Sequence, residues 1–231
     1  MMVGPARQQL DRSRVAAAAL EYIDRHGAGA LTMRALGQEL GVEAMAMYRY
    51  IHGREDLLEA VVAQLLAGLV EALDDQLRGS WQGYLQDMAH AVRRIAVEHP
   101  AAFPLVATRH PAAPWLRPPL RSLELVEDFL TALIGHGFSD EQAARTYRAF
   151  SSFLLGQLLL EASQRGAPTA PVEEPLDEGD AQLPHRDGGL NLQDIPHTQR
   201  LRPLLSEDRS LEEFENALET LLDRLEMNLS Q

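Results

Sequence analysis

Thr-Met-Arg-Ala-Leu-Gly-Gln-Glu-Leu-Gly-Val-Glu-Ala-Met-Ala-Met-Tyr-Arg-Tyr-Ile-His-Gly-Arg, residues 32–54, is the stretch that decides the fold of this chain. Thr32 is a typical N-cap for a short helix, and Gly41 supplies the left-handed residue that ends it. A second short helix is expected after Val42. Two helices of about two turns, joined through a glycine, are typical of the helix-turn-helix, in which the second helix enters the major groove of DNA. Their spacing alone leaves a structural helix–helix corner as the alternative.

The residues on either side of this stretch favour the first interpretation. A preceding helix is expected from the N-cap Asp11 to His26, with Gly27 beyond its end. Its apolar side chains recur at helical spacing and predict packing against the next two helices: Val15, Ala18, Ala19, Tyr22 and Ile23. Residues 10–62 resemble the N-terminal DNA-binding domain of the tetracycline-repressor (TetR) family. They share the helix ending in His-Gly, the sequence Leu-Thr-x-Arg-x-Leu-Gly-x-x-Leu-Gly-Val and an aromatic-rich recognition helix.

The side chains of this region suit different parts of DNA. Thr32 offers a hydroxyl at a helix N-terminus to a phosphate, and Arg34 has the geometry to read a guanine edge, as the resemblance also implies. The run 44–46 has no polar side chains, so it is suited to thymine methyl groups and not to hydrogen bonds with bases. The predicted DNA-binding residues are Thr32, Met33, Arg34, Ala44, Met45, Ala46, Tyr48, Arg49, Tyr50, His52 and Arg54.

The resemblance implies phosphate contacts for three of these residues, Tyr48, Tyr50 and Arg54. Simple packing is the alternative for Tyr48. Arg12 and Arg14, ahead of the first helix's core, either reach a phosphate or are exposed without a partner.

The composition is that of an ordinary globular protein, with 45% hydrophobic and 24% charged residues among 231. No apolar run approaches the roughly 20 residues that span a bilayer, and the N-terminus lacks a signal-peptide pattern. The chain has no Cys, which excludes disulfides and thiolate metal sites. We therefore expect a cytoplasmic protein without a membrane partner.

The net charge of −13 argues at first against a DNA partner. The first 60 residues, however, hold seven Arg and eight acidic residues, a balance of −1, so the remaining −12 lies in residues 61–231. All 21 basic residues are Arg, which suits bidentate contacts to phosphate or guanine but is equally explained by genomic base composition.

A single reading domain buries too little surface for useful affinity, so a homodimer on a palindromic double-stranded operator is expected. The predicted fold is all-α: a helix-turn-helix domain of three helices at residues 1–60, then a helical ligand-binding and dimerisation domain at residues 61–231. The first helix of the second domain is expected to run from Arg54 to about Leu77 and to act as a lever.

Four further helices follow from apolar periodicity and capping residues. They are expected at Trp81 to about Glu98 after the cap Ser80, at Pro119 to about Gly135, at 140 to about 164 behind the capping box Ser139–Gln142, and after a second capping box at Ser210–Glu213. Residues 166–206, rich in Pro, Gly and acid, are expected to form a mobile loop.

The apolar stripe of the last helix is typical either of core or of an interface. It comprises Phe214, Leu218, Leu221, Leu222, Leu225 and Leu229. Together with the 140–164 helix, in which Gly156 permits close approach, and two symmetry mates, it would form the four-helix interface that the resemblance implies.

The chain beyond Trp81 also resembles the tetracycline-repressor C-terminal domain, through Ser-Trp-Gln at 80–82, Ala-Thr-Arg at 107–109 and His-Gly-Phe-Ser at 136–139. That subgroup binds tetracycline with magnesium through a His shortly before Thr-Arg, where this chain has Leu105 or Val106. We therefore expect no metal and no cofactor, and an apolar or aromatic effector. The predicted ligand-binding residues are Met88, Val92, Phe103, Leu105, Thr108, Trp115, Phe129 and Phe150, each of which is otherwise a core residue.

The sequence thus predicts a transcriptional repressor released from its operator by a small molecule. It shows no nucleophile elbow, phosphate loop or zincin motif, and His90, His99, His110 and His136 lack metal-ligand spacing, so no enzymatic activity is expected. The alternatives are a helical protein-binding adaptor and a helical enzyme without a recognisable catalytic motif.

Overall fold

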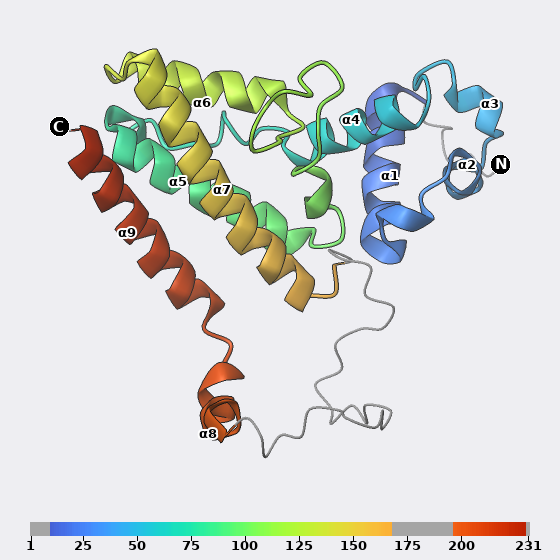
Figure 1. The fold of residues 1–231 in the computed structure, drawn as a ribbon. Coiled ribbons are helices and arrows are strands. Elements are labelled where there is room, and N and C mark those ends of the chain that lie inside the picture. The colour runs from blue at the N-terminus through green and yellow to red at the C-terminus, as the bar shows by residue number, and fades with distance from the viewer. Residues whose placement is uncertain (1–9, 168–195, 230–231) are drawn as a thin grey trace, which may run out of the picture.

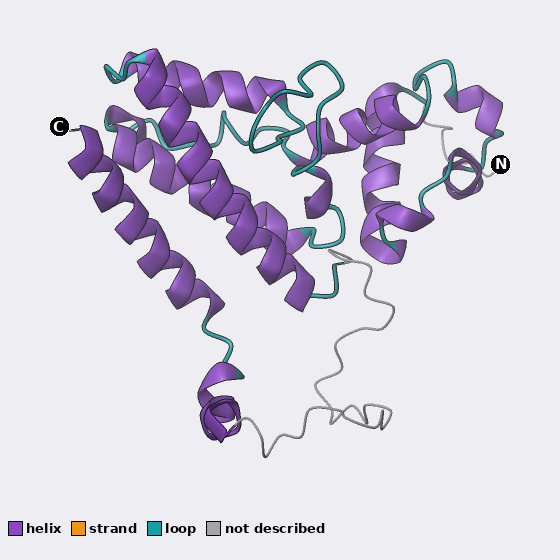
Figure 2. Ribbon diagram, in the orientation of Figure 1, coloured by secondary structure: helices purple, strands orange, loops and turns teal. Residues whose placement is uncertain are grey.

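The computed structural model describes residues 10–167 and 196–229, and in these residues it contains helices and loops without strands (Figure 2). The predicted all-α class is confirmed. The helices α1 (Arg12–His26), α2 (Met33–Leu40) and α3 (Ala44–Met47) form an N-terminal unit at the end of the molecule farthest from α9 (Figure 1). The body consists of α5 (Trp81–Glu98), α6 (Leu123–Gly135), α7 (Asp140–Gln164) and α9 (Ser210–Leu229), and α4 (Arg54–Leu65) lies between the two.

Several predicted helix ends are confirmed. The Asp11 carboxylate accepts a hydrogen bond from the N–H of Arg14 and caps α1, and the Thr32 hydroxyl accepts one from Ala35 and caps α2. Gly41 ends α2 with a φ of 65°. Ser80 caps α5, and the capping box at Ser139 opens α7.

The predicted lever helix from Arg54 to Leu77 is wrong, because α4 ends at Leu65. Gly68 has a φ of 73°, which is incompatible with a continuing right-handed helix, and turns lead from there to a 3₁₀ helix at Leu77–Gly79. The apolar spacing misled the prediction since Leu69 and Leu73 are buried even though they lie outside any helix.

Other boundaries also differ from expectation. The second helix of the helix-turn-helix, α3, has four residues rather than about two turns. The predicted helix from Pro119 begins only at Leu123, since the N–H of Arg121 donates to Val106 and Ser122 supplies the cap. Ser210 is the first residue of α9 rather than its cap, and its hydroxyl donates to Asp208.

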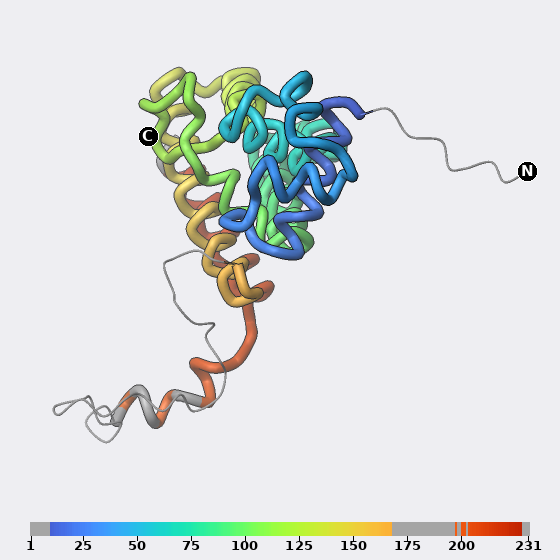
Figure 3. The backbone as a smooth tube through the Cα atoms, turned by 90° about the vertical axis from the view of Figure 1, so that its right-hand side faces the viewer, coloured from blue at the N-terminus to red at the C-terminus, as the bar shows by residue number. Residues whose placement is uncertain are grey.

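Part of the predicted 166–206 loop is helical. Helix α8 (Pro196–Leu205) lies apart from the body in both views (Figures 1 and 3), whereas residues 168–195 lie outside the described residues. None of the described helices is both long and apolar enough to cross a membrane. The domain boundary expected at residue 60 falls within α4.

One continuous core runs through both parts of the molecule. Val15, Ile23 and Leu36 are fully buried in the N-terminal unit, and α1 also packs against α4. In the body, α7 packs against α5, α6 and α9. The apolar stripe of α9 is core within the chain for Phe214, Leu218, Leu222 and Leu225, and Leu221 is half-buried; the Leu229 side chain lies outside the described part.

Candidate DNA interface and ligand cavity

The short α3 is held in place by two side chains that point inward. Met47, at its end, and Ile51, just beyond it, are fully buried in the core of the N-terminal unit. The N–H of Val42 donates to the Gly37 carbonyl at 2.9 Å and closes the turn between α2 and α3. Because Met47 faces the core, the side chains on the opposite face of α3 are exposed and can contact another molecule.

Every predicted DNA-binding residue is at least partly exposed. Met45 is 73% exposed and Tyr48 is 43% exposed, so Tyr48 is not a core residue of this chain. Thr32, Arg34, Arg49, His52 and Arg54 are also exposed, and Met33, Ala44, Ala46 and Tyr50 are half-buried. The exposed start of α3 is apolar, and basic and aromatic side chains flank it.

Two arginines near this surface make contacts within the chain. Nη1 of Arg54 donates to the Leu31 carbonyl at 3.1 Å and joins the start of α4 to the start of α2. Arg12, for which a phosphate or no partner was expected, donates to the Asp56 carboxylate at 2.6 Å and to the Tyr50 carbonyl at 3.1 Å. It therefore fixes α1 against α4.

The environment of Asp56 favours its charged form. The hydrogen bond from Arg12 lowers the pKa of Asp56 below its ordinary value, and the N–H of His52, at 2.6 Å, lowers it further. The hydrogen bond between Arg12 and the Asp56 carboxylate also raises the pKa of Arg12.

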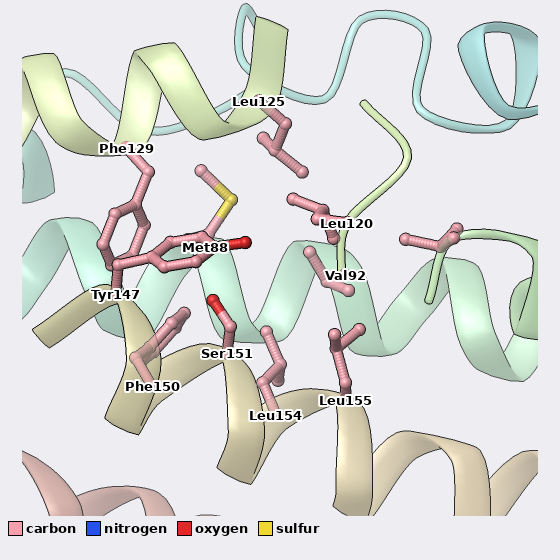
Figure 4. A pocket seen from close by; sticks show the side chains of 11 residues that line it. Met88, Val92, Leu120, Leu125, Phe129, Tyr147, Phe150, Ser151, Leu154 and Leu155 are labelled. Atoms are coloured by element: carbon pink, nitrogen blue, oxygen red, sulfur yellow. The ribbon is translucent and has the colours of Figure 1, made fainter. Parts of the chain in front are cut away.

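The body contains a small apolar cavity of about 30 Å³ (Figure 4). Four parts of the chain supply its walls: α5, α6, α7 and the segment between Val106 and Leu120. The lining residues are Met88, Val92, Val106, Leu120, Leu125, Phe129, Tyr147, Phe150, Ser151, Leu154 and Leu155.

Two hydroxyl groups interrupt these apolar walls (Figure 4). The Tyr147 hydroxyl donates to the Pro118 carbonyl at 3.1 Å, and burial raises the pKa of Tyr147 to about 12. Ser151 is buried one turn further along α7. Apolar walls with a few polar groups are typical of small-molecule sites, although sites for drug-sized ligands have volumes of about 300–1,000 Å³.

The structure brings together four of the eight predicted ligand-binding residues: Met88, Val92, Phe129 and Phe150 line the cavity. Phe103 and Leu105 are buried but not in its wall. The Thr108 hydroxyl donates to the Leu105 carbonyl at 2.6 Å, and Trp115 is 73% exposed.

Sequence reasoning missed the remaining seven lining residues. Tyr147, Ser151, Leu154 and Leu155 share a face of α7 at helical spacing with Phe150, and this signal was available. Val106 and Leu120 reach the cavity through an irregular segment, for which periodicity gives no signal. Among residues 10–167 and 196–229, no three His, Asp or Glu side chains are grouped closely enough to hold a metal ion.

Comparison with known proteins agrees with this architecture. Residues 15–61 match the family described as bacterial regulatory proteins, tetR family, and residues 74–229 match the tetracyclin repressor-like C-terminal domain. The class D tetracycline repressor protein of Escherichia coli is 30% identical over 169 residues, which cover 71% of this chain and 74% of the repressor.

Solved structures give the same result. A possible TetR family transcriptional regulator from Streptomyces coelicolor has a TM-score of 0.72 at 28% identity, with 94% of this chain and 99% of that chain covered. Streptomyces coelicolor ActR in complex with (S)-DNPA shares the fold, with a TM-score of 0.66, 21% identity and coverage of 96% and 99%.

The chain therefore belongs to the TetR family of transcriptional regulators and carries a tetracycline repressor-like C-terminal domain. Members of this class regulate transcription by binding DNA through the helix-turn-helix, and the relatives described above are regulators rather than enzymes.

Proposed function

We propose that this protein is a homodimeric repressor that binds a palindromic operator and is released from it by a small apolar or aromatic molecule. The observation that carries the proposal is the surface of α2 and α3, where the predicted DNA-binding residues are all accessible while Met47 and Ile51 hold the helix from behind.

In this proposal the surface reads DNA by two kinds of contact. Arg34 reads a guanine edge, and Met45, the most exposed apolar side chain of α3, packs on thymine methyl groups. Thr32, Tyr48, Tyr50 and Arg54 contact phosphates and set the orientation of the helix. The remaining hydrogen-bond donors of Arg54 serve this role while Nη1 keeps its contact with Leu31.

Dimerisation uses α7 and α9. Apolar side chains remain exposed on both helices, with Leu160 67%, Leu211 55% and Met227 52% exposed. A Cβ atom at Gly156 would meet no heavy atom within 4 Å beyond its two neighbours and the nearby backbone of its own helix, so a partner helix has room to approach there. Two recognition helices about 34–36 Å apart then enter successive major grooves.

The effector binds by enlarging the cavity. Its present volume of about 30 Å³ holds little more than one water molecule, so a ligand must displace the walls. The Tyr147 and Ser151 hydroxyls provide polar contacts on the α7 side. ActR, which shares this fold, has been solved in complex with (S)-DNPA. To change the ratio of the DNA-binding to the released conformation from 99:1 to 1:99, the effector must bind the released conformation about 10⁴-fold more tightly, a difference of ~5.5 kcal/mol.

Selection of duplexes from a random library with the full-length protein tests the proposal. We expect a palindromic sequence, a solution mass of two chains, and loss of DNA binding when a compound that binds the protein is added. Leu160→Arg should give a single chain with weakened operator binding. A monomeric protein that selects no duplex at moderate salt would refute the proposal, and selection without release by any bound compound would refute its effector part.

A further inference from the structure

One irregular stretch of the body touches both the cavity and α4. We call residues 106–122 the connecting segment. It leaves the cavity wall at Val106 and returns to it at Leu120, and both side chains line the cavity. The N–H of Arg121 donates to the Val106 carbonyl at 3.0 Å, so the two ends of the segment are held together. A shift of the wall at either end is therefore shared by Arg121.

The connecting segment contacts α4 through two basic side chains. Nη2 of Arg121 donates to the Glu55 carboxylate. Nε2 of His110 lies 3.3 Å from the Glu59 carboxylate, and its Nδ1 accepts from the N–H of Ala112. Glu55 and Glu59 are four residues apart, so they lie one turn apart on the same face of α4.

The same turns of α4 are fixed to the N-terminal unit. Arg54, next to Glu55, donates to the Leu31 carbonyl at the start of α2. Asp56 accepts from Arg12 of α1 and from the N–H of His52, which follows α3. Residues 54 and 56 thus contact the N-terminal unit, and residues 55 and 59 contact the connecting segment.

Arg121 is the better placed of the two basic side chains to transmit a displacement. Its side chain is 4% exposed, and Nη1 donates to the Thr108 hydroxyl at 3.0 Å within the same segment. Its Nε is buried without a hydrogen-bond partner in the described structure. Because this side chain is buried and its Nη1 is bound to Thr108, a movement of the backbone beside Leu120 is passed to Glu55.

We propose that Arg121 is the positioning residue that couples the cavity to the DNA surface. It acts on α4 through its hydrogen bond to Glu55, and the His110–Glu59 contact attaches the connecting segment to α4 at a second point. The inference rests on the proposed function, because it assigns the route by which cavity expansion weakens DNA binding. Expansion displaces Leu120, Arg121 follows, and the first turns of α4 change their position relative to α1 and α2.

A second route across the junction is the rival. Nδ1 of His99, at the end of α5, lies 2.7 Å from the Asp24 carboxylate of α1, and α5 also lines the cavity. The side chains of this pair are 32% and 28% exposed, which makes Asp24→Asn a matched control for a contact at the same junction.

The test replaces the unidentified effector by side chains that overfill the cavity. Ser151→Phe fills it from α7 and Val92→Phe fills it from α5, so that one variant suffices if the other fails to fold. Each is combined with Glu55→Gln and, separately, with Asp24→Asn. Glu55 is 65% exposed, but Glu55→Gln leaves the buried Arg121 guanidinium without its counter-charge, so urea denaturation first establishes that each variant is folded under the binding conditions. The readout is the dissociation constant of the full-length dimer for the duplex that the unaltered protein selects.

Each cavity-filling replacement is compared with the same protein without it. We expect the replacement to weaken DNA binding about tenfold when it is the only change and about tenfold in the Asp24→Asn background, but less than about twofold in the Glu55→Gln background. If Glu55 has only a structural role, Glu55→Gln should lower the affinity for DNA by the same factor with and without the cavity-filling replacement. The inference would be overturned if cavity filling weakened DNA binding equally in the Glu55→Gln background, or if it had no effect as the only change. Either result would leave the proposed DNA-binding function standing. Failure to select any duplex would instead end the proposed function.

Discussion

The proposed DNA surface and the cavity of this protein draw their residues from very different distances along the sequence. The proposed DNA-binding residues all lie between Thr32 and Arg54, and the residues that set the two ends of α2, Thr32 and Gly41, stand next to that helix. In the body, the cavity draws its walls from residues as far apart as Met88 and Leu155, and Glu161 of α7 pairs with Arg93 of α5.

This difference has a consequence for function. A surface built from locally determined elements presents DNA-binding side chains in a fixed arrangement. A cavity enclosed by four separate segments changes shape when any of them moves, which is what a ligand-controlled equilibrium requires. Changes in the body should therefore act on packing over long distances, whereas changes in the N-terminal unit should act on one element or one contact.

The largest effect is expected from the buried carboxylate of the body. Glu161 is 2% exposed, and both of its oxygens accept from Arg93, at 2.7 and 3.1 Å, while Arg165 adds a contact at 3.2 Å. Glu161→Gln leaves Arg93 without its counter-charge and should lower the free energy of unfolding by about 3 kcal/mol, measured by urea denaturation.

A second variant separates charge from packing. The double replacement Arg93→Met with Glu161→Leu should recover most of this stability, because apolar groups of similar volume substitute well for buried ion pairs. Glu215→Gln, which alters an exposed pair with His90 at 3.1 Å, should change stability little. A Glu161→Gln protein as stable as the Glu215→Gln protein would show that long-range polar contacts do not hold the body.

The next effect concerns one contact of the N-terminal unit. Arg34→Ala removes a proposed guanine contact and should weaken operator binding by about 2 kcal/mol, or about 30-fold, without changing thermal stability. Arg94→Ala, an exposed arginine of α5, is the matched control and should leave affinity unchanged. Titrations at one fixed salt concentration measure both. Equal losses for the two variants would mean that only overall charge matters.

The same difference explains how far the sequence could be used for prediction. Caps and glycine turns are short-range signals, and they located α1, α2, α5 and α7 correctly. Apolar spacing was a poorer guide where a backbone feature overrode it. Leu69 and Leu73 extended the predicted helix past Leu65 since burial and helical conformation are separate properties, and Gly68 decided the outcome.

The cavity was the part least accessible to prediction. Met88 and Val92 lie on a regular helix, where spacing shows which residues share a face. Leu120 lies in a proline-rich segment whose path depends on contacts with distant residues, such as the hydrogen bond from Arg121 to Val106. No pattern within the segment itself indicates such a contact. Trp115 and Thr108, chosen for their chemistry, lie outside the cavity for the same reason.

A smaller effect is expected at the turn between α2 and α3. Gly41 has a φ of 65°, so Gly41→Ala should lower the free energy of unfolding by about 1 kcal/mol. Gly29→Ala is the control, because Gly29 does not have a positive φ and a side chain there would meet no atom within 4 Å. Thermal unfolding of the two variants gives the comparison. Equal stabilities would show that the turn is not determined by its own residue.

The smallest effect is expected from the contact between α1 and α4. Arg12 and Asp56 are 44 residues apart, and their side chains are 48% and 22% exposed, so solvent screens the pair. Arg12→Ala should lower the free energy of unfolding by about 0.5 kcal/mol at pH 7.

The pKa of Asp56 is lowered in the folded state from its ordinary 3.8, so the stabilisation is fully present above pH 3.8 and is lost as the pH falls through the lowered pKa. Urea denaturation of both proteins should give a constant difference from pH 7 to about pH 4 and a smaller one in stronger acid, where Arg12 keeps its hydrogen bond to the Tyr50 carbonyl. A cost near that of Glu161→Gln would mean that the N-terminal unit, like the body, depends on long-range contacts.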